Sequence, residues 1–470
     1  MAGIGFNLQK VLEGDTFLDS VKAHFYSALI CAGPWLLSII TLFSLGYFMP
    51  RNIDNYEIIL FRAVIIYIFA FSLITVGIFH FPVTRYLADK LYSKEQEELI
   101  PVFNTTSLFV LVLQCVIGSA FFYMTEMPLN LKLLAILIYQ TVSMLWLLMI
   151  FLTALRDYQA IVGAYLAGSL ITVISSLALG RWLGLEGYFL GYLIGHLVIV
   201  ILWAARIFIE FDSGGFFDQD FMGFLKQHRR LILIGFFYNT AIWIDKIVFW
   251  YSSNATEVTS HLRVFPPYDS AVFFAYLTII PSLAIFLLRV ETDFYKQYRR
   301  YYSAILEKDD YNSICQVRKN MTKQIRQSAG VLIRYQGILS LLIITFAPKF
   351  AELLGIPFVQ IPIFRMAVVG AFLHSLLLMI LILILYFDFQ NLALMVSAVF
   401  LVTNGLFALI TSNMELIYFG YGYLVASLVS LMVAYYSLDF MLGRLEFLTF
   451  ASQPVGRHRE EEIAQSEAEE

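Results

Sequence analysis

The chain has 470 residues, of which 60% are apolar and only 14% are charged, and its formal net charge is −4. Its mean hydropathy is +0.75. A soluble domain averages about 45–50% apolar and about 25% charged residues, so this composition excludes a soluble globular protein. The slightly acidic balance gives no reason to expect a nucleic-acid partner.

Apolar runs recur along the whole chain, and we interpret each long run as a membrane-spanning helix. About 20 apolar residues in a helix cross the hydrocarbon core, and backbone groups in lipid must be paired within the segment. We therefore predict an all-α polytopic membrane protein with about twelve transmembrane helices. The predicted spans cover residues 24–48, 58–81, 101–123, 131–153, 160–180, 188–209, 231–252, 269–289, 328–347, 362–386, 391–412 and 418–439. Pro34 and Pro281 lie inside spans and are expected to kink them.

The distribution of lysine and arginine predicts the orientation of the chain in the membrane. The chain has 31 of these residues, and most fall in segments that share one side of the membrane. The opposite loops hold only Arg51, Lys132, Arg181, Arg263 and Lys349. Because cytoplasmic loops are enriched in these residues, both termini are predicted to be cytoplasmic.

The two halves of the chain follow the same plan, in which an amphipathic segment precedes six spans. Residues 1–22 are predicted to form an interfacial helix and residues 23–210 a six-helix bundle. Residues 211–230 are a linker with a second amphipathic helix. Residues 231–440 are a second six-helix bundle with a cytoplasmic insert at 290–327, and residues 441–470 are a cytoplasmic acidic tail. Two such pseudo-repeats with a cavity between them are typical of transporters built from parallel repeats.

The sequence lacks the usual motifs of enzymatic and metal chemistry. It contains neither a G-x-x-x-x-G-K-[ST] phosphate loop nor an H-E-x-x-H motif. Asp218-Gln219-Asp220 matches the D-x-D pattern of many glycosyltransferases, but segment 211–230 is too short for a nucleotide-binding fold. We expect the start of an interfacial helix there, and we expect no enzymatic activity, no cofactor and no metal site.

Ionisable residues inside the predicted spans are the main candidates for function. A charge at mid-bilayer costs at least ~2.5–3.5 kcal/mol, so it usually faces a bundle interior or a water-filled cavity. Asp245 and Lys246 are adjacent in the seventh span. Adjacent helix positions diverge by about 100°, so these two residues need not pair. Arg62 and Arg365 lie near span ends, where they can also snorkel to the interface.

Aromatic and amide side chains occur near these charges, namely Trp35, Tyr67, Tyr238, Asn239 and Trp243. Such side chains suit a carbohydrate, which presents apolar C–H faces and many hydroxyl groups. We therefore predict that these five residues and the four charged ones line a substrate path. The same aromatic residues also suit simple helix packing, and both interpretations stay open.

Three N-terminal segments resemble the PelG family. They are MAGIGF at residues 1–6, AGPWLLSI at residues 32–39 and TRYLADKLY at residues 84–92. The length and the plan of two six-helix halves agree with this family along the chain. The resemblance implies a fold of the superfamily that moves drugs, lipid-linked oligosaccharides and polysaccharides across membranes.

The resemblance also implies a function. It implies export of the N-acetylgalactosamine-rich Pel exopolysaccharide across the bacterial inner membrane, in biosynthesis of the biofilm matrix. The implied partners are the cytoplasmic glycosyltransferase PelF and the membrane proteins PelD and PelE. Two alternatives stay open: an ion-coupled flippase for small molecules or lipid-linked oligosaccharides, with Asp245 as the coupling carboxylate, and a non-transporting scaffold for the synthase complex.

Overall fold

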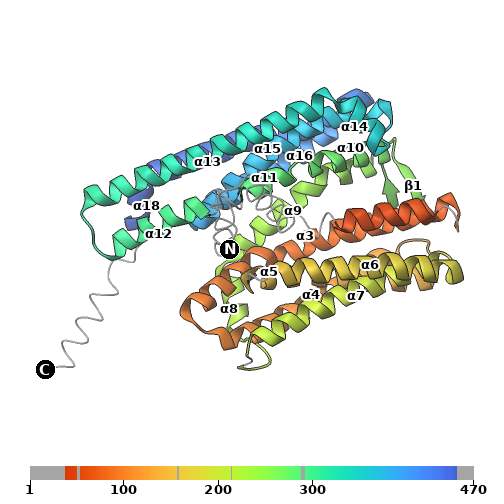
Figure 1. The fold of residues 1–470 in the computed structure, drawn as a ribbon, viewed down its shortest axis with the longest axis horizontal. Helices are drawn as coiled ribbons and strands as arrows, with labels where there is room; N and C mark the ends of the chain where they lie inside the picture. The colour runs from red at the N-terminus through yellow and green to blue at the C-terminus, as the bar shows by residue number, and fades with distance from the viewer. Residues whose placement is uncertain (1–36, 50–52, 156–157, 213, 287–291, 452–470) are drawn as a thin grey trace, which may run out of the picture.

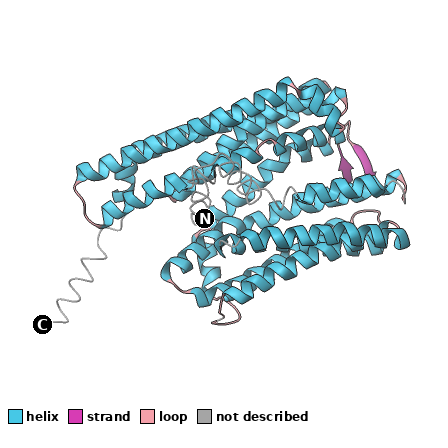
Figure 2. Ribbon diagram, in the orientation of Figure 1, coloured by secondary structure: helices cyan, strands magenta, loops and turns pink. Residues whose placement is uncertain are grey.

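The computed structural model describes residues 37–49, 53–155, 158–212, 214–286 and 292–451, and most of these residues are helical (Figure 2). Within these ranges, 11 helices are long and apolar enough to cross a membrane. A shorter apolar helix, Leu37–Phe48, corresponds to the later part of the first predicted span. The earlier part of that span, with Pro34 and Trp35, lies outside the described residues. The prediction of a multi-pass all-α membrane protein is confirmed.

The first half of the chain forms a bundle of long antiparallel helices, here called the N-terminal bundle (Figure 1). In it, α7 packs against α6 and α5, and α5 also packs against α3 and α4. Its buried core is rich in aromatic residues, including Phe61, Tyr188 and Phe189. The bundle consists of α3 (Asn55–Ser93), α4 (Leu99–Tyr123), α5 (Leu129–Leu155), α6 (Tyr158–Leu183) and α7 (Leu185–Glu210), with a 3-10 turn at Gln96–Glu98.

The second half forms the C-terminal bundle, in which α15 packs against α17, α10 and α13, and α16 packs against α9 and α17. Its long helices are α9 (Arg229–Trp250), α13 (Tyr311–Thr345), α15 (Ile361–Tyr386), α16 (Gln390–Ser412) and α17 (Phe419–Gly443). Its shorter elements are α10 (Pro266–Leu277), α11 (Ile280–Ile285), α14 (Ala347–Leu354) and the 3-10 turns Phe358–Gln360 and Leu416–Tyr418. Three peripheral helices are α8 (Asp220–Gln227), α12 (Thr292–Leu306) and α18 (Leu445–Ala451).

The two bundles meet along α3 and α9, which lie side by side in the middle of the molecule (Figure 1). Gly77 of α3 faces Gly235 of α9 so closely that a Cβ on Gly235 would clash with the carbonyl oxygen of Gly77. Near the C-terminal end of α9, the ring of Trp250 stacks on the ring of Tyr67 of α3, with centroids 4.5 Å apart. We call this α3–α9 contact the seam.

A two-stranded antiparallel hairpin covers one end of the seam, and we call this end of the molecule the hairpin end. Its strands are β1 (Thr256–Thr259) and β2 (Leu262–Val264). Tyr56 of α3 donates a hydrogen bond to the carbonyl of Val258 at 3.1 Å. The sequence gives no sign of this hairpin, because each strand is too short for an alternating pattern to be recognised. The opposite end, which carries α8, α12 and α18, is called the α12 end.

The helix boundaries differ from the predicted spans where a helix continues past its apolar part. Helix α3 includes Pro82 and ends only at Ser93, because Tyr86 is still buried, against Phe221 and Phe224 of α8. Helix α13 begins at Tyr311, so the later part of segment 290–327 belongs to the same helix as the ninth span.

Pro281 and the D-x-D segment both lie at helix starts, as the sequence predicts for the second of them. The expected kink at Pro281 is present as a break between α10 and α11, and Pro281 occupies the first turn of α11. The D-x-D segment starts a helix, as expected. Asp218 Oδ1 accepts hydrogen bonds from the backbone N–H groups of Asp220 and Phe221 at 2.7 and 2.9 Å, at the start of α8.

Candidate substrate path

The centre of the candidate site is a buried ion pair on α9. Lys246 Nζ lies 3.0 and 3.1 Å from the two carboxylate oxygens of Asp245. Asp245 is 0% exposed and Lys246 is 6% exposed, so neither side chain faces lipid. Two opposite charges held in contact form a neutral unit, which is far less costly to bury than either charge alone.

Aromatic side chains enclose this ion pair. Tyr268 of α10 donates a hydrogen bond to Asp245 Oδ2 at 2.7 Å. The Lys246 ammonium lies over the ring of Tyr276 at 4.8 Å and over the ring of Trp243 at 5.8 Å. The negative face of an aromatic ring attracts a cation at these distances. The lysine is therefore held by a carboxylate and by two ring faces.

Toward the hairpin end, the cluster continues through a second carboxylate, the half-buried Asp269. Trp250 Nε1 donates to both oxygens of Asp269, at 3.0 and 2.9 Å. The backbone N–H of Phe265 also donates to this carboxylate, at 3.1 Å. Because Trp250 stacks on Tyr67 of the N-terminal bundle, this part of the cluster reaches the seam.

Toward the α12 end, the cluster continues through His374 of α15. Its Nε2 lies 3.1 Å from the hydroxyl of Tyr238, and its Nδ1 lies 2.9 Å from the hydroxyl of Tyr423. The rings of Tyr276 and Tyr423 are 5.5 Å apart, which connects this group to the wall around Lys246. Asn239, next to Tyr238, donates to the carbonyl of Gly235 at the tightest point of the seam.

A smaller polar group lies in the N-terminal bundle. Gln114 Nε2 of α4 donates to the hydroxyl of Thr75 at 2.6 Å, and the hydroxyl of Tyr139 lies 3.3 Å from the same oxygen. One turn away, Trp146 Nε1 donates to the hydroxyl of Ser72 at 3.0 Å. These groups are neutral, so the charged residues of the candidate path belong to the C-terminal bundle.

The structure brings most of the predicted path residues together and places two of them, Arg62 and Arg365, away from the others. Tyr67, Tyr238, Asn239, Trp243, Asp245 and Lys246 all belong to the seam or to the cluster beside it. Arg62 is exposed and its guanidinium packs against Gly46 of the helix Leu37–Phe48. Arg365 donates to the carbonyl of Ile344 at 3.2 Å, away from the cluster. Trp35 lies outside the described residues.

Sequence reasoning missed Tyr268, Asp269, Tyr276 and Tyr423. Asp269 occupies the first turn of α10, where an acidic residue is commonly interpreted as stabilising the helix start. The tyrosines are scattered over the chain and only the packing of α10 and α17 against α9 and α15 brings them together. Within the described residues, no group of three or more His, Cys, Asp or Glu side chains could hold a metal ion.

Comparisons with known proteins agree with this architecture. The model of the PelG family, described as "Putative exopolysaccharide Exporter (EPS-E)", matches residues 1–450. No curated protein matches the chain.

Solved structures with a similar fold are transporters. A crystal structure of MATE in complex with MaL6 has a TM-score of 0.63 at 14% identity, covering 93% of this chain and 98% of that chain. An outward-facing multidrug resistance MATE family transporter of the MOP superfamily has a TM-score of 0.58 at 13% identity, with the same coverage. A MOP superfamily transporter from Pyrococcus furiosus has a TM-score of 0.57 at 14% identity, covering 92% of this chain and 98% of that chain. At this identity the likeness shows the fold, and it confirms the flippase-like class with two six-helix repeats.

Proposed function

Because the chain belongs to the PelG family of exopolysaccharide exporters, we propose that it exports Pel exopolysaccharide across the bacterial inner membrane. The family and the MATE-like fold are those of a polysaccharide or flippase-type transporter. The finer proposal is that the cargo is the N-acetylgalactosamine-rich polymer of the biofilm matrix.

The observation that carries the proposal is the ion pair of Asp245 and Lys246, enclosed by tyrosine and tryptophan side chains beside the seam. Hydroxyl, indole and carboxylate groups offer hydrogen bonds to sugar hydroxyls, and ring faces offer stacking surfaces to C–H groups. We propose that the bundles at residues 23–210 and 231–440 move relative to each other at the seam. In the open state, Trp243 and Tyr238 would contact the polymer.

The ion-coupled alternative requires a carboxylate that is free to bind a proton or a metal cation. Asp245 is the obvious candidate, but Lys246 neutralises it and Tyr268 donates a hydrogen bond to it. An occupied carboxylate binds a second cation poorly, because that cation must displace the lysine. The geometry therefore supports polymer export over coupling through Asp245. Efflux lost in Asp245→Asn, with secretion of the polysaccharide unaffected, would favour this alternative.

We also propose an orientation and partners. Among the described residues outside the spans, most of the lysines and arginines lie at the α12 end, which supports a cytoplasmic location for this end. The distribution of these residues along the sequence supports the same location for both termini. A cytoplasmic glycosyltransferase, PelF, would deliver the polymer there, with PelD and PelE as membrane partners.

The test of export is to delete the gene while keeping the glycosyltransferase. Polymer should then accumulate inside the cell and disappear from the medium, whereas normal secretion would refute the proposal.

Trp243→Ala separates transport from scaffolding, since it removes a ring from the path and leaves the α12 end unchanged. It should reduce secretion while the synthase still binds; unchanged secretion would argue against the path, and lost synthase binding would favour a scaffold.

A further inference from the structure

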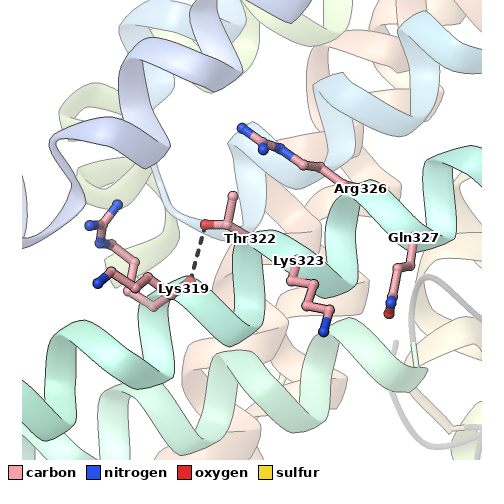
Figure 3. Close-up of a pocket in the computed structure, with 6 residues that line it drawn as sticks. Lys319, Thr322, Lys323, Arg326 and Gln327 are labelled. Atoms are coloured by element: carbon pink, nitrogen blue, oxygen red, sulfur yellow. Dashed lines mark hydrogen bonds between the residues drawn. The ribbon is translucent and has the colours of Figure 1, made fainter.

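A basic cavity lies on α13 near the α12 end, far from the seam cluster. Its volume is about 490 Å³, and Figure 3 shows its lining residues. All of them belong to a stretch of fewer than three helical turns, and most are cationic. They are Arg318, Lys319, Thr322, Lys323, Arg326 and Gln327.

The cations of this cavity are only partly neutralised. Arg318 forms an ion pair with Glu446 of α18 and donates to the carbonyl of Leu442 at 3.0 Å. Arg326 lies 3.9 Å from Asp439, and both side chains are largely exposed, so this pair is weak. Lys319 and Lys323 are exposed and form no ion pair with any described residue. The cavity therefore has unbalanced positive charge.

The amide of Gln327 adds a neutral hydrogen-bond donor to the cavity. Figure 3 shows Lys323 and Gln327 extending from the same side of α13, whereas Arg326 extends away from them. The hydroxyl of Thr322 donates to the carbonyl of Arg318 at 3.0 Å, so it has no hydrogen left to donate to a bound anion. Two ammonium groups and one amide are thus available to bind an oxyanion.

The position of the cavity along α13 matches the boundary of the membrane. On the C-terminal side of the cavity, exposed apolar side chains of α13 begin at Ile333 and continue with Tyr335, Ile338 and Leu341. Gln327 precedes Ile333 by six residues and Lys323 precedes it by ten, which is roughly 9 and 15 Å along a helix axis. Lys319 is farther away, at roughly 21 Å. On the neighbouring α17, exposed Tyr435 and Tyr436 lie just before Asp439, and exposed tyrosines are typical of the membrane interface. The end of the cavity that holds Lys323 and Gln327 is therefore the end nearest the lipid headgroups and the apolar surface above them.

We propose that this cavity binds the phosphate-bearing headgroup of an anionic phospholipid. Lys323 and Gln327 bind the phosphate oxygens, and the acyl chains lie along the exposed face of α13 that starts at Ile333. Lys319 adds positive charge on the side of the cavity that lies farther from the membrane. A cluster of four lysine and arginine side chains close to the end of a membrane-spanning segment is suited to such headgroups. This inference does not depend on the exporter proposal, because it needs only the membrane setting of α13.

A second source of negative charge is the C-terminal tail. Residues 452–470 contain Glu460, Glu461, Glu462, Glu467, Glu469 and Glu470, and α18, which precedes the tail, already contacts Arg318. The apolar face above the cavity favours a lipid over this peptide, because the tail has little apolar surface to place there. Occupation by the tail is an outcome that the experiment distinguishes.

The test is binding of phosphatidylglycerol to the detergent-purified full chain, followed by native mass spectrometry. Phosphatidylcholine is the neutral comparison lipid, and inorganic phosphate is the soluble competitor. Lys319→Gln/Lys323→Gln should weaken phosphatidylglycerol binding about tenfold and leave phosphatidylcholine binding unchanged. Lys226→Gln/Lys349→Gln, which removes two other exposed lysines, should leave the binding of both lipids unchanged.

The proposal would be overturned if phosphatidylglycerol binding fell equally in the two double variants. It would also be overturned if the wild-type chain bound phosphatidylglycerol no better than phosphatidylcholine. Displacement of the lipid by millimolar inorganic phosphate would show that the site takes a soluble anion. A chain ending at residue 451 should bind the lipid as the full chain does. If binding appeared only after this truncation, the tail would be the occupant and the lipid proposal would fail.

Discussion

The ammonium nitrogen of Lys246 contacts both carboxylate oxygens of Asp245, although the two residues are neighbours in α9. Adjacent side chains diverge around a helix, so the flexible lysine must fold back along the axis. It does so while donating to the carbonyl of Ile242, one turn earlier, at 3.0 Å. The pair is buried as a neutral unit, which accounts for two ionisable residues in the middle of an apolar span.

Lys246→Met should destabilise the protein more than removal of both charges. The single variant leaves the carboxylate of Asp245 buried without its counter-ion, which costs about 3–5 kcal/mol. Asp245→Asn/Lys246→Met should recover much of this loss, because an amide needs no counter-ion. Denaturant unfolding of the purified variants in detergent measures the difference. Equal destabilisation by the single and double variants would show that the pair contributes nothing as a unit.

Gly235→Ala should force α3 and α9 apart. The added methyl group would collide with the carbonyl oxygen of Gly77, and overpacking of this kind costs about 1–3 kcal/mol. Gly330→Ala is the matched control, because Gly330 lies inside helix α13 with no atom within 4 Å of the added Cβ. It should be neutral or stabilise by up to about 1 kcal/mol through helix propensity. The same unfolding experiment compares the two variants. Destabilisation by Gly235→Ala alone indicates a tight contact at the seam, whereas equal destabilisation by both would indicate that these helices tolerate alanine poorly in general.

Tyr67→Phe should loosen the hairpin without disturbing the bundles. The Tyr67 hydroxyl donates to the carbonyl of Arg263 at 2.8 Å and accepts from its N–H at 3.2 Å. Loss of both bonds costs about 1–3 kcal/mol, because two backbone groups lose their partner. Hydrogen exchange of residues 256–264 should become faster. Tyr435→Phe, an exposed tyrosine on α17, should leave this exchange unchanged, and an equal effect would contradict the role of Tyr67.

Much of the fold could be predicted from the sequence, because lipid imposes a simple rule on helix length. The span predicted at 391–412 is α16 at Gln390–Ser412, and the span predicted at 131–153 is α5 at Leu129–Leu155. The rule fails where helices leave the membrane. In α13, residues 311–327 are helical and amphipathic, so hydropathy alone gives no sign that the helix starts before the span.

The candidate site could be predicted only where it carries charge inside a span. Asp245 and Lys246 are conspicuous in an apolar segment, and the structure places both in the cluster. Tyr268 and Tyr423 look like ordinary aromatic residues in the sequence, and their part in the cluster depends on tertiary packing. Arg365 is equally conspicuous, but it satisfies a carbonyl at the end of α13. A charged residue inside a span therefore predicts that its side chain makes a polar contact, but the sequence does not show which group it contacts.

A cross-link between residues 85 and 388 should stop export. Arg85 of α3 and Asp388, in the turn after α15, form an ion pair at 3.3 Å that joins the two bundles at the α12 end. Both side chains are partly exposed, so the pair itself contributes only about 0–1 kcal/mol, and Arg85→Gln should have little effect. Arg85→Cys/Asp388→Cys joined by a short cleavable reagent should abolish secretion, and cleavage should restore it.

This experiment needs a background in which Cys31, Cys115 and Cys315 are replaced by serine. Each single-cysteine variant treated with the same reagent is the control and should secrete normally. Full secretion through the cross-linked protein would show that the bundles do not separate at this end during transport.

The most direct measurement is polymer translocation into vesicles that contain the purified protein. The glycosyltransferase and its nucleotide sugar are added outside, on the side of the α12 end, and polymer protected from an added glycosidase is measured. We predict that protected polymer accumulates with the wild-type chain and not with the cross-linked 85–388 variant. Synthase that binds the vesicles and makes polymer, none of which becomes protected, would contradict export and leave the protein as a scaffold.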